Sequence, residues 1–179
     1  MQPQSVTPVK LIFGVLYSDE KLLEQAKDML SDIYGKIDYQ SPVFDFTISE
    51  YYYPEMGFPI FRLFFSHQNL IYPNQLAKIK IETNEIELKL AVSEKRKVNL
   101  DPGYMDYDKY VLASAKYNGQ KVYLDLGIYA DLTLRYEKGR FFPFPWSFPD
   151  FKSGIYNEAF IMIRAKYKGQ VRKLYRIVR

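Results

Sequence analysis

Asn99 and Asp101 are two polar residues whose types and spacing could support chemistry. They lie in VNLDPGYMD, where a predicted strand over 97–101 places both side chains on the same face. An amide and a carboxylate on one strand face can hold a polar ligand, and carboxylate oxygen is also a ligand that Mg²⁺ and Ca²⁺ accept. The Asp101-Pro102-Gly103 segment equally suits a type II turn, with Pro at the second and Gly at the third position. A turn explains those three residues but not Asn99 or the following Tyr104.

A second polar set lies on a predicted helix that begins after Pro73. At 100° per residue, Lys80, Asn84 and Glu87 form a polar stripe beside the apolar one. Such a stripe could line a groove at the edge of the sheet. The alternative is a solvated helix flank with ordinary contacts between residues three and four apart.

Three further segments carry candidates. Glu55 lies in the loop EYYYPEMG, and loops often carry binding residues. Tyr129 and Asp131 share one face of the alternating segment GIYADLTLRY, and a solvent-facing strand would show the same pattern. Trp146 is the only Trp and lies in PWSFPD, where packing beneath a loop is the competing interpretation.

Several kinds of chemistry lack the residues they need. The chain has no Cys, which removes disulfides, thiolate catalysis and Cys-based zinc sites. His67 is the only His, so a His-rich metal site is impossible, and no nucleophile elbow accompanies it. Neither a P-loop motif nor the Gly-rich dinucleotide fingerprint occurs, and the sequence leaves the cofactor unknown. A carboxylate site for a hard cation stays open.

The elements that must position these residues follow from hydrophobic periodicity. The run KLIFGVLYS (10–18) predicts a doubly buried strand, followed by a helix that Ser18 caps and Gly35 ends. Strands over 43–49 and 60–66, the helix after Pro73 and the strand over 97–101 complete a βαββαβ order at about 9–101. The first and third strands are the most apolar. Since a ferredoxin-like arrangement places those two at the centre of its sheet, we expect that arrangement.

The remainder predicts an antiparallel meander over 105–144 and a helix over 154–168. Asn118-Gly119 suits a tight hairpin turn within the meander. A chain of 179 residues with 47% hydrophobic residues has the size of one domain, and no linker separates its parts. The predicted class is therefore a single α+β domain, with a ferredoxin-like portion, a β-meander and a C-terminal helix.

Basic residues concentrate at the C-terminus. From Arg164 onward there are seven basic and no acidic residues, while the rest of the chain has 18 basic against 21 acidic. A predicted tail over 169–179 could therefore contact nucleic acid, or could be a solvated helix end. No apolar run approaches the length of a membrane helix and the N-terminus lacks the pattern of a signal peptide, so we expect a cytoplasmic protein without a membrane partner.

The motifs PVKLIFGVLYS, EMG, TNEIE, VNLDPGY, LGIYADLTL and FPWSFPDF, in this order, resemble the domain-of-unknown-function 4416 family over roughly residues 8–168. VNLDPGY and GIYADLTL are the most specific of them. The resemblance implies a mostly prokaryotic family without an established activity, and it supplies no catalytic role. The positions that match its motifs are Glu55, Thr83, Asn84, Asn99, Asp101, Tyr104, Tyr129, Asp131, Trp146 and Asp150.

Three functions fit these observations. The first is binding of a small polar ligand in a groove between the second helix and the sheet, rimmed by Asn84, Asn99, Asp101, Tyr104, Tyr129 and Asp131. The second is a metal-assisted or acid–base enzyme, in which Asp101, Asp131 and Glu55 or Glu87 supply carboxylates. The third is nucleic-acid binding through the basic tail.

Overall fold

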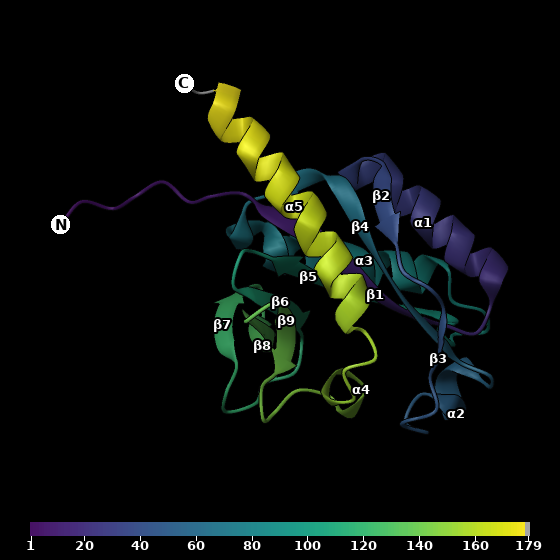
Figure 1. Ribbon diagram of the computed structural model, residues 1–179. Coiled ribbons are helices and arrows are strands. Elements are labelled where there is room, and N and C mark those ends of the chain that lie inside the picture. Colours follow the sequence, from purple (N-terminus) through teal and green to yellow (C-terminus); the bar gives the residue numbers. More distant parts are fainter. Residues whose placement is uncertain (178–179) are drawn as a thin grey trace.

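The computed structural model describes residues 1–177 and shows an α+β protein, which confirms the predicted class (Figure 1). Within these residues all nine strands belong to one sheet, and its strand pairs are antiparallel. In chain order the elements are β1 (Val9–Tyr17), α1 (Glu20–Tyr34), β2 (Ile37–Gln40), β3 (Phe44–Asp45), α2 (Tyr53–Met56), β4 (Phe61–Ile71), η1 (Pro73–Gln75), α3 (Leu76–Lys89), β5 (Val98–Met105), β6 (Lys109–Ser114), β7 (Val122–Asp125), β8 (Ile128–Glu137), β9 (Arg140–Pro143), α4 (Pro149–Lys152) and α5 (Asn157–Ile177).

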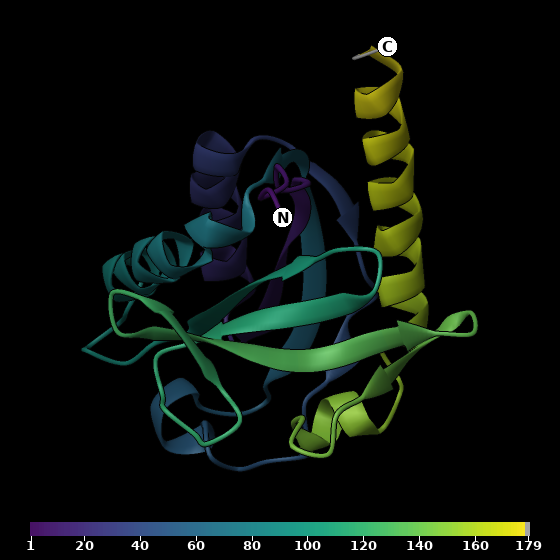
Figure 2. The same cartoon turned by 90° about the vertical axis from the view of Figure 1, so that its left-hand side faces the viewer.

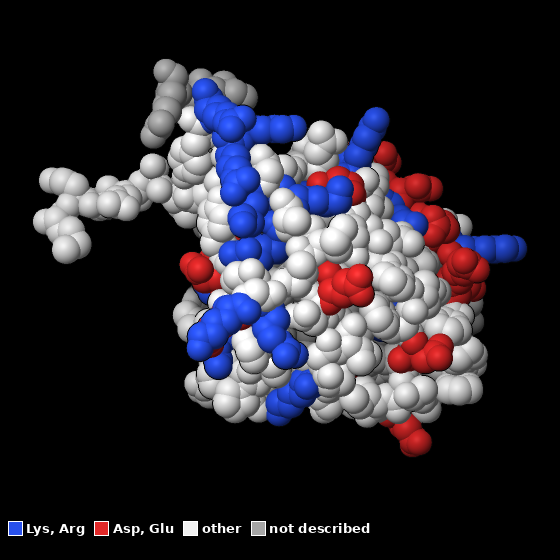
Figure 3. All heavy atoms as spheres, viewed as in Figure 1, with Lys and Arg blue, Asp and Glu red and all other residues white. Residues whose placement is uncertain are grey.

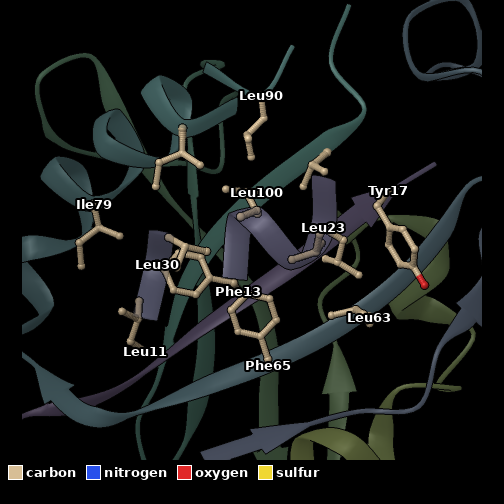
Figure 4. Packing of buried hydrophobic residues seen from close by; sticks show 14 of the residues in the cluster. Leu11, Phe13, Tyr17, Leu23, Leu30, Leu63, Phe65, Ile79, Leu90 and Leu100 are labelled. Atoms are coloured by element: carbon tan, nitrogen blue, oxygen red, sulfur yellow. The ribbon is translucent and has the colours of Figure 1, made fainter. Parts of the chain in front are cut away.

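The strand order is β2-β4-β1-β5-β6-β8-β7, with β3 added to β4 and β9 added to β8. The two most apolar strands, β1 and β4, lie at the centre of the N-terminal portion, as predicted. Every residue of β1 is buried because helices cover both faces of this part of the sheet. On one face α1 and α3 pack over β1, β4 and β5, and Leu30, Ile79 and Leu100 meet there around Phe13 (Figure 4). On the other face α5 packs through Phe160 and Ile163.

Helix α1 follows the predicted spacing, but Ser18 does not cap it. The side chain of Asp19 accepts the N–H of Leu22, so Asp19 is the N-cap. The Ser18 hydroxyl instead donates to the Met56 carbonyl at 2.6 Å. Gly35 ends the helix with a φ of 85°, where glycine avoids the strain of a side chain. The predicted strand over 43–49 is also wrong: β3 is only two residues long, and β2 at 37–40 pairs with β4 beside it.

The C-terminal strands are antiparallel, as expected, but the hairpin predicted at Asn118-Gly119 is wrong. Strand β6 pairs with β8, and β7 pairs with the far side of β8. The tight turn lies at Leu126-Gly127, where both residues have positive φ values of 54° and 75°. That pair of left-handed residues is the geometry of a type I′ turn. Asn118-Gly119 belongs to the longer connection between β6 and β7.

Strand β5 corrects the interpretation of VNLDPGYMD. Asp101, Pro102 and Gly103 form no turn; they continue the strand to Met105 and pair with Gly14, Phe13 and Ile12 of β1. Gly103 is required for space. A Cβ there would lie 2.7 Å from Tyr110 Cε2 and from the Val111 carbonyl oxygen, closer than real contacts allow.

Helix α5 extends beyond the predicted end at 168. The segment 169–177, expected to be a tail, continues the helix, and residues 178 and 179 lie outside the described part of the chain. Contacts with the body hold this end: Gln170 accepts from the buried Lys10 ammonium at 2.8 Å and donates to the Gln68 carbonyl at 2.5 Å. The C-terminal half of the helix stands beside the sheet and projects past it (Figure 2).

Candidate functional site

The candidate site lies where the first half of β5 has no strand beside it. Strand β6 pairs only with residues 103–105, so the outer edge of β5 is open before that point. Helix α3 covers this edge with two buried charged side chains. Glu87 accepts the Leu100 N–H at 2.6 Å, and Lys80 donates to the Leu100 carbonyl at 2.8 Å. The two side chains thus replace the hydrogen bonds that another strand would make.

The open edge also explains Pro102 in a strand interior. The N–H and C=O groups of successive residues point to opposite sides of a strand, so Pro102, two residues after Leu100, has the same orientation as Leu100, away from β1. Its missing N–H therefore removes no hydrogen bond to β1. A proline is tolerated at such an edge and not in the middle of a sheet.

Asn99 and Asp101 lie on the face of β5 opposite to Leu100, and Asp101 is paired with Gly14 of β1. Arg62 of β4 reaches across this glycine, because a Cβ at Gly14 would lie 3.2 Å from Arg62 Nη1. Its guanidinium lies 3.2 Å from Asp150 of α4 and 3.8 Å from Asp101. A glycine in β1 therefore allows an arginine on one neighbouring strand to reach an aspartate on the other.

Two buried polar atoms in this region lack partners. Within residues 1–177 neither Arg62 Nε nor the Tyr110 hydroxyl has a hydrogen-bond partner. Arg62 is 6% exposed and Tyr110 is fully buried, with its ring over Gly103. Burial raises the pKa of Tyr110, with the charge of Asp101 as the next cause, so the hydroxyl stays protonated. An unpartnered buried donor costs stability and calls for an explanation such as a bound molecule.

Arg96 joins the remaining charges of the site. Its guanidinium binds both oxygens of Glu55, at 2.6 and 2.8 Å, and donates to Glu87 at 2.8 Å and to Asn99 Oδ1 at 2.9 Å. The bidentate hydrogen bonds to Glu55 are the largest cause of its raised pKa. Arg96 thus connects the 53–56 helix to α3 and β5.

Asp101 is one of three members of this network that reach solvent, together with Glu55 and Arg96. Its side chain is 27% exposed, and it accepts a hydrogen bond from Asn99 Nδ2 at 2.9 Å. Lys80 lies 3.6 Å away and Arg62 3.8 Å away, both beyond hydrogen-bonding distance. Tyr52 lies nearby, since burial raises the pKa of its hydroxyl to about 12 and the charge of Asp101 is the second cause. Asp101 therefore has acceptor capacity left for a further donor.

The carboxylates of the site face cations and not one another. Glu55 and Glu87 share Arg96, and Glu87 and Asp101 lie 3.9 and 3.6 Å from the Lys80 ammonium. In the described part of the chain no group of three or more His, Cys, Asp or Glu residues is arranged to hold a metal ion. Burial is the main cause of the raised pKa of Glu87, and both of its carboxylate oxygens already accept hydrogen bonds, from the Leu100 N–H and from Arg96. The arrangement suits binding better than proton transfer.

A family model for a domain of unknown function, DUF4416, matches residues 7–167, nearly the whole chain. The chain belongs to the DUF4416 family. A search of curated proteins and a search of solved structures each found no match. Within residues 1–177, no helix has the length and apolar composition needed to cross a membrane. The positions of this DUF4416 chain that build the site all fall inside the matched range.

The structure brings five of the ten sequence candidates together in this DUF4416 site. Glu55, Lys80, Glu87, Asn99 and Asp101 form one connected network. Asn84 lies half-buried on α3, between the turns that carry Lys80 and Glu87.

The other four candidates lie elsewhere in the sheet. Tyr104 is on the opposite face of β5 and packs in the core beneath α3. Asp131 shares the face of Asp101 but is two strands away, in the row of Gly103 and Leu112, and its carboxylate pairs with Lys121 at 3.3 Å. The next two candidates have packing roles: Tyr129 contacts the rings of Tyr117 and Tyr123, and Trp146 donates to the Leu132 carbonyl at 2.8 Å and stacks on Phe144.

Sequence reasoning missed Arg62, Arg96 and Tyr110 in this DUF4416 chain. Arg62 carried a usable signal, because it is the one charged residue in the apolar run IFRLFFS, and a charge within a buried strand needs a partner. Arg96 lies in the charged segment SEKRK, where nothing distinguishes it from its neighbours. Tyr110 is one of 17 tyrosines, and only the pairing of β5 with β6 places it over Gly103.

Proposed function

We propose that this DUF4416 protein binds a small polar ligand at Asp101. One observation carries the proposal: a partly exposed carboxylate with spare acceptor capacity lies beside two buried donors, Arg62 Nε and the Tyr110 hydroxyl, that have no partner in residues 1–177. A ligand that accepts a hydrogen bond from one of these donors and donates one to Asp101 would satisfy both the unpartnered donor and the spare acceptor. Water could satisfy them in the free protein.

The charges of the site favour a particular class of ligand. Arg62, Lys80 and Arg96 supply three cations, and Glu55, Glu87, Asp101 and Asp150 supply four carboxylates, which gives a formal net charge of −1. Each cation already has an acidic partner, and the most exposed of these charged side chains, Glu55, is a carboxylate. We therefore expect a neutral or singly cationic molecule that carries N–H or O–H donors and at least one acceptor, and we expect anions to be excluded.

A thermal-shift screen tests this proposal. Neutral nucleosides, amides and sugars, amino acids and small amines are compared with anionic counterparts such as nucleotides and sugar phosphates. At least one neutral or cationic compound should raise the melting temperature of the wild type and fail to raise that of Asp101→Asn. Glu85→Gln is the matched control, because Glu85 is an exposed carboxylate on α3. No shift with any neutral or cationic compound, or equal shifts in wild type and Asp101→Asn, would refute the proposal.

Three broader features belong to the same proposal. The strand order β2-β4-β1-β5 supports the description of the N-terminal portion as ferredoxin-like, and one continuous sheet supports a single domain. The absence of Cys is compatible with work in the reducing cytoplasm.

A further inference from the structure

The C-terminal helix presents a row of basic residues on one side. The row consists of Arg164, Lys168, Arg172 and Arg176, which follow at four-residue steps. Each therefore lies about 6 Å further along the helix axis than the one before and is rotated about that axis by about 40°. From Arg164 onward the sequence contains no acidic residue to neutralise them. Lys and Arg side chains gather along α5 in Figure 3, whereas the acidic side chains in that view lie mainly over other elements.

The β8–β9 hairpin forms the opposite wall of this basic surface. At its tip the hairpin adds the exposed Lys138, whereas Arg135 and Arg140 lie on the hairpin face opposite to Tyr136, away from α5. Between the hairpin and the helix lies a depression of about 370 Å³, lined by Tyr136, Gly139, Ile161, Arg164, Lys168 and Arg172. We call this depression the α5–hairpin groove. Its volume is at the lower end of the range for small-molecule sites.

The lining of the groove includes the Tyr136 ring, and Arg164 stacks on that ring. The guanidinium carbon of Arg164 lies 3.4 Å from the centre of the Tyr136 ring, and Arg164 is held there by two hydrogen bonds to the Tyr107 carbonyl. Basic side chains interleaved with aromatic rings are typical of surfaces that bind single-stranded nucleic acid.

Gly169 provides an independent indication that something approaches the helix here. It lies inside α5, lines the groove and has no atom within 4 Å of the position its Cβ would occupy. A glycine in a helix interior lowers stability by about 0.5–1 kcal/mol relative to alanine, and here no packing requires it. The missing side chain leaves the helix backbone accessible to a ligand in the groove.

We propose that the α5–hairpin groove binds the phosphodiester backbone of a single-stranded nucleic acid. The basic row supplies evenly spaced phosphate contacts, and the concave space between helix and hairpin admits one strand but not a duplex. An acidic membrane surface fits less well, because a flat surface cannot enter the groove and the apolar face of α5, which includes Phe160 and Ile163, is buried in the protein. This surface is separate from the Asp101 site, so either proposal can fail alone.

The proposal differs from binding by a flexible C-terminal tail. Two of the groove residues, Tyr136 and Gly139, precede α5 by more than 15 positions, and Arg164 lies before position 169. A deletion of residues 169–179 would therefore remove one part of the groove and leave the hairpin, Arg164 and Lys168 in place.

Fluorescence anisotropy with the full chain and a labelled single-stranded oligonucleotide tests the proposal. With four phosphate contacts, the affinity should fall about 50-fold between 50 and 200 mM salt, because log K falls by about 0.7 per contact for each tenfold rise in salt. Lys168→Gln/Arg172→Gln removes two contacts, so its affinity should fall only about 7-fold over the same range. A duplex of the same sequence should bind more weakly than the single strand.

The matched control is Lys166→Gln/Lys173→Gln, which removes two exposed charges of α5 that do not line the groove. Its salt dependence should remain close to that of the wild type. Gly169→Leu keeps every charge and fills the groove, and it should weaken binding at least 5-fold without a change in the salt dependence. Thermal unfolding of each variant shows whether it is folded.

Four outcomes would overturn the proposal. They are equal effects of the two double variants, no binding of the oligonucleotide at 50 mM salt, full binding by Gly169→Leu, and binding to vesicles of acidic lipid in place of the oligonucleotide. The first would indicate unspecific charge attraction and the last a membrane surface.

Discussion

Replacement of Arg62 by Met removes the cation that lies between Asp101 and Asp150. Met fills much of the volume of Arg and keeps contact with the surrounding Phe46, Phe64 and Phe151 rings, which lie 5.4–5.9 Å from the guanidinium carbon. The main loss is therefore electrostatic. Asp150 is left with its carboxylate 5% exposed and with one remaining hydrogen bond, from the Tyr156 hydroxyl at 3.2 Å.

Removal of one partner from a buried ion pair costs about 3–5 kcal/mol, because the other charge stays buried without compensation. The contact with Asp101 adds little, since it is 3.8 Å long and Asp101 is 27% exposed. We therefore expect Arg62→Met to lower the free energy of unfolding by about 3–4 kcal/mol. For a chain of this size, that corresponds to a drop in melting temperature of about 6–16 °C.

Urea unfolding at pH 7, followed by far-ultraviolet circular dichroism, measures the change. Asp150→Asn removes the charge that Arg62→Met leaves behind. The double variant should therefore lose at least about 1 kcal/mol less free energy of unfolding than the sum of the losses of the two single variants. Arg135→Met is the matched control. Its guanidinium is 50% exposed and lies 3.5 Å from Glu137, so its effect should stay within about 0.5 kcal/mol. A loss below about 1 kcal/mol for Arg62→Met, or strict additivity with Asp150→Asn, would refute the reasoning.

Two other predictions concern glycines and the only histidine. Gly103→Ala should destabilise the protein by about 1–3 kcal/mol, because its Cβ would lie 2.7 Å from the Val111 carbonyl oxygen, whereas Gly169→Ala, in open space, should stabilise it by about 0.5–1 kcal/mol. Chemical unfolding tests both changes. An unchanged free energy of unfolding in Gly103→Ala would contradict the close packing of β5 on Tyr110. Burial lowers the pKa of His67 below its usual 6.5, so the unfolded chain binds a proton that the folded chain does not. The contribution of His67 to stability is therefore complete only above about pH 7.5, and it is lost as the pH falls through 6.5, by at most about 1.4 kcal/mol per pH unit. His67→Gln should flatten this part of the profile. An unchanged slope in His67→Gln would show that other groups cause it.

The N-terminal half of the fold was largely accessible to sequence reasoning, because its strongest elements are set by local hydrophobic patterns. A continuous apolar run makes β1 a central strand, and amphipathic periodicity predicts α1 and α3. The length of α5 was underestimated. Its last turns are held by Gln170, whose partners Lys10 and Gln68 lie more than 100 positions earlier.

The errors in the strands arise where tertiary contacts override a local turn preference. Pro102-Gly103 has the composition of a turn but lies in a strand, because Pro102 faces an open edge and Gly103 leaves space for Tyr110. Asn118-Gly119 resembles a hairpin turn, yet β6 pairs with β8, and β7, which lies between them in sequence, pairs with the far side of β8. Local sequence cannot show which strand will be the neighbour.

The candidate site was accessible only in part for the same reason. The polar stripe of α3 and the polar face of β5 could be predicted by periodicity, and the structure joins them at Leu100. Arg62 and Tyr110 enter the site only through the pairing of β1 with its two neighbours and of β5 with β6. Long-range register decides those contacts.

Isothermal titration calorimetry tests ligand binding at Asp101 most directly. The compound that gives the largest thermal shift is titrated into wild type, Asp101→Asn and Glu85→Gln at the same pH and salt. A hydrogen bond to a charged group contributes about 1.5–3 kcal/mol, so Asp101→Asn should raise the dissociation constant by at least about 10-fold, while Glu85→Gln should leave it unchanged. Equal dissociation constants for wild type and Asp101→Asn would contradict the assignment of the site.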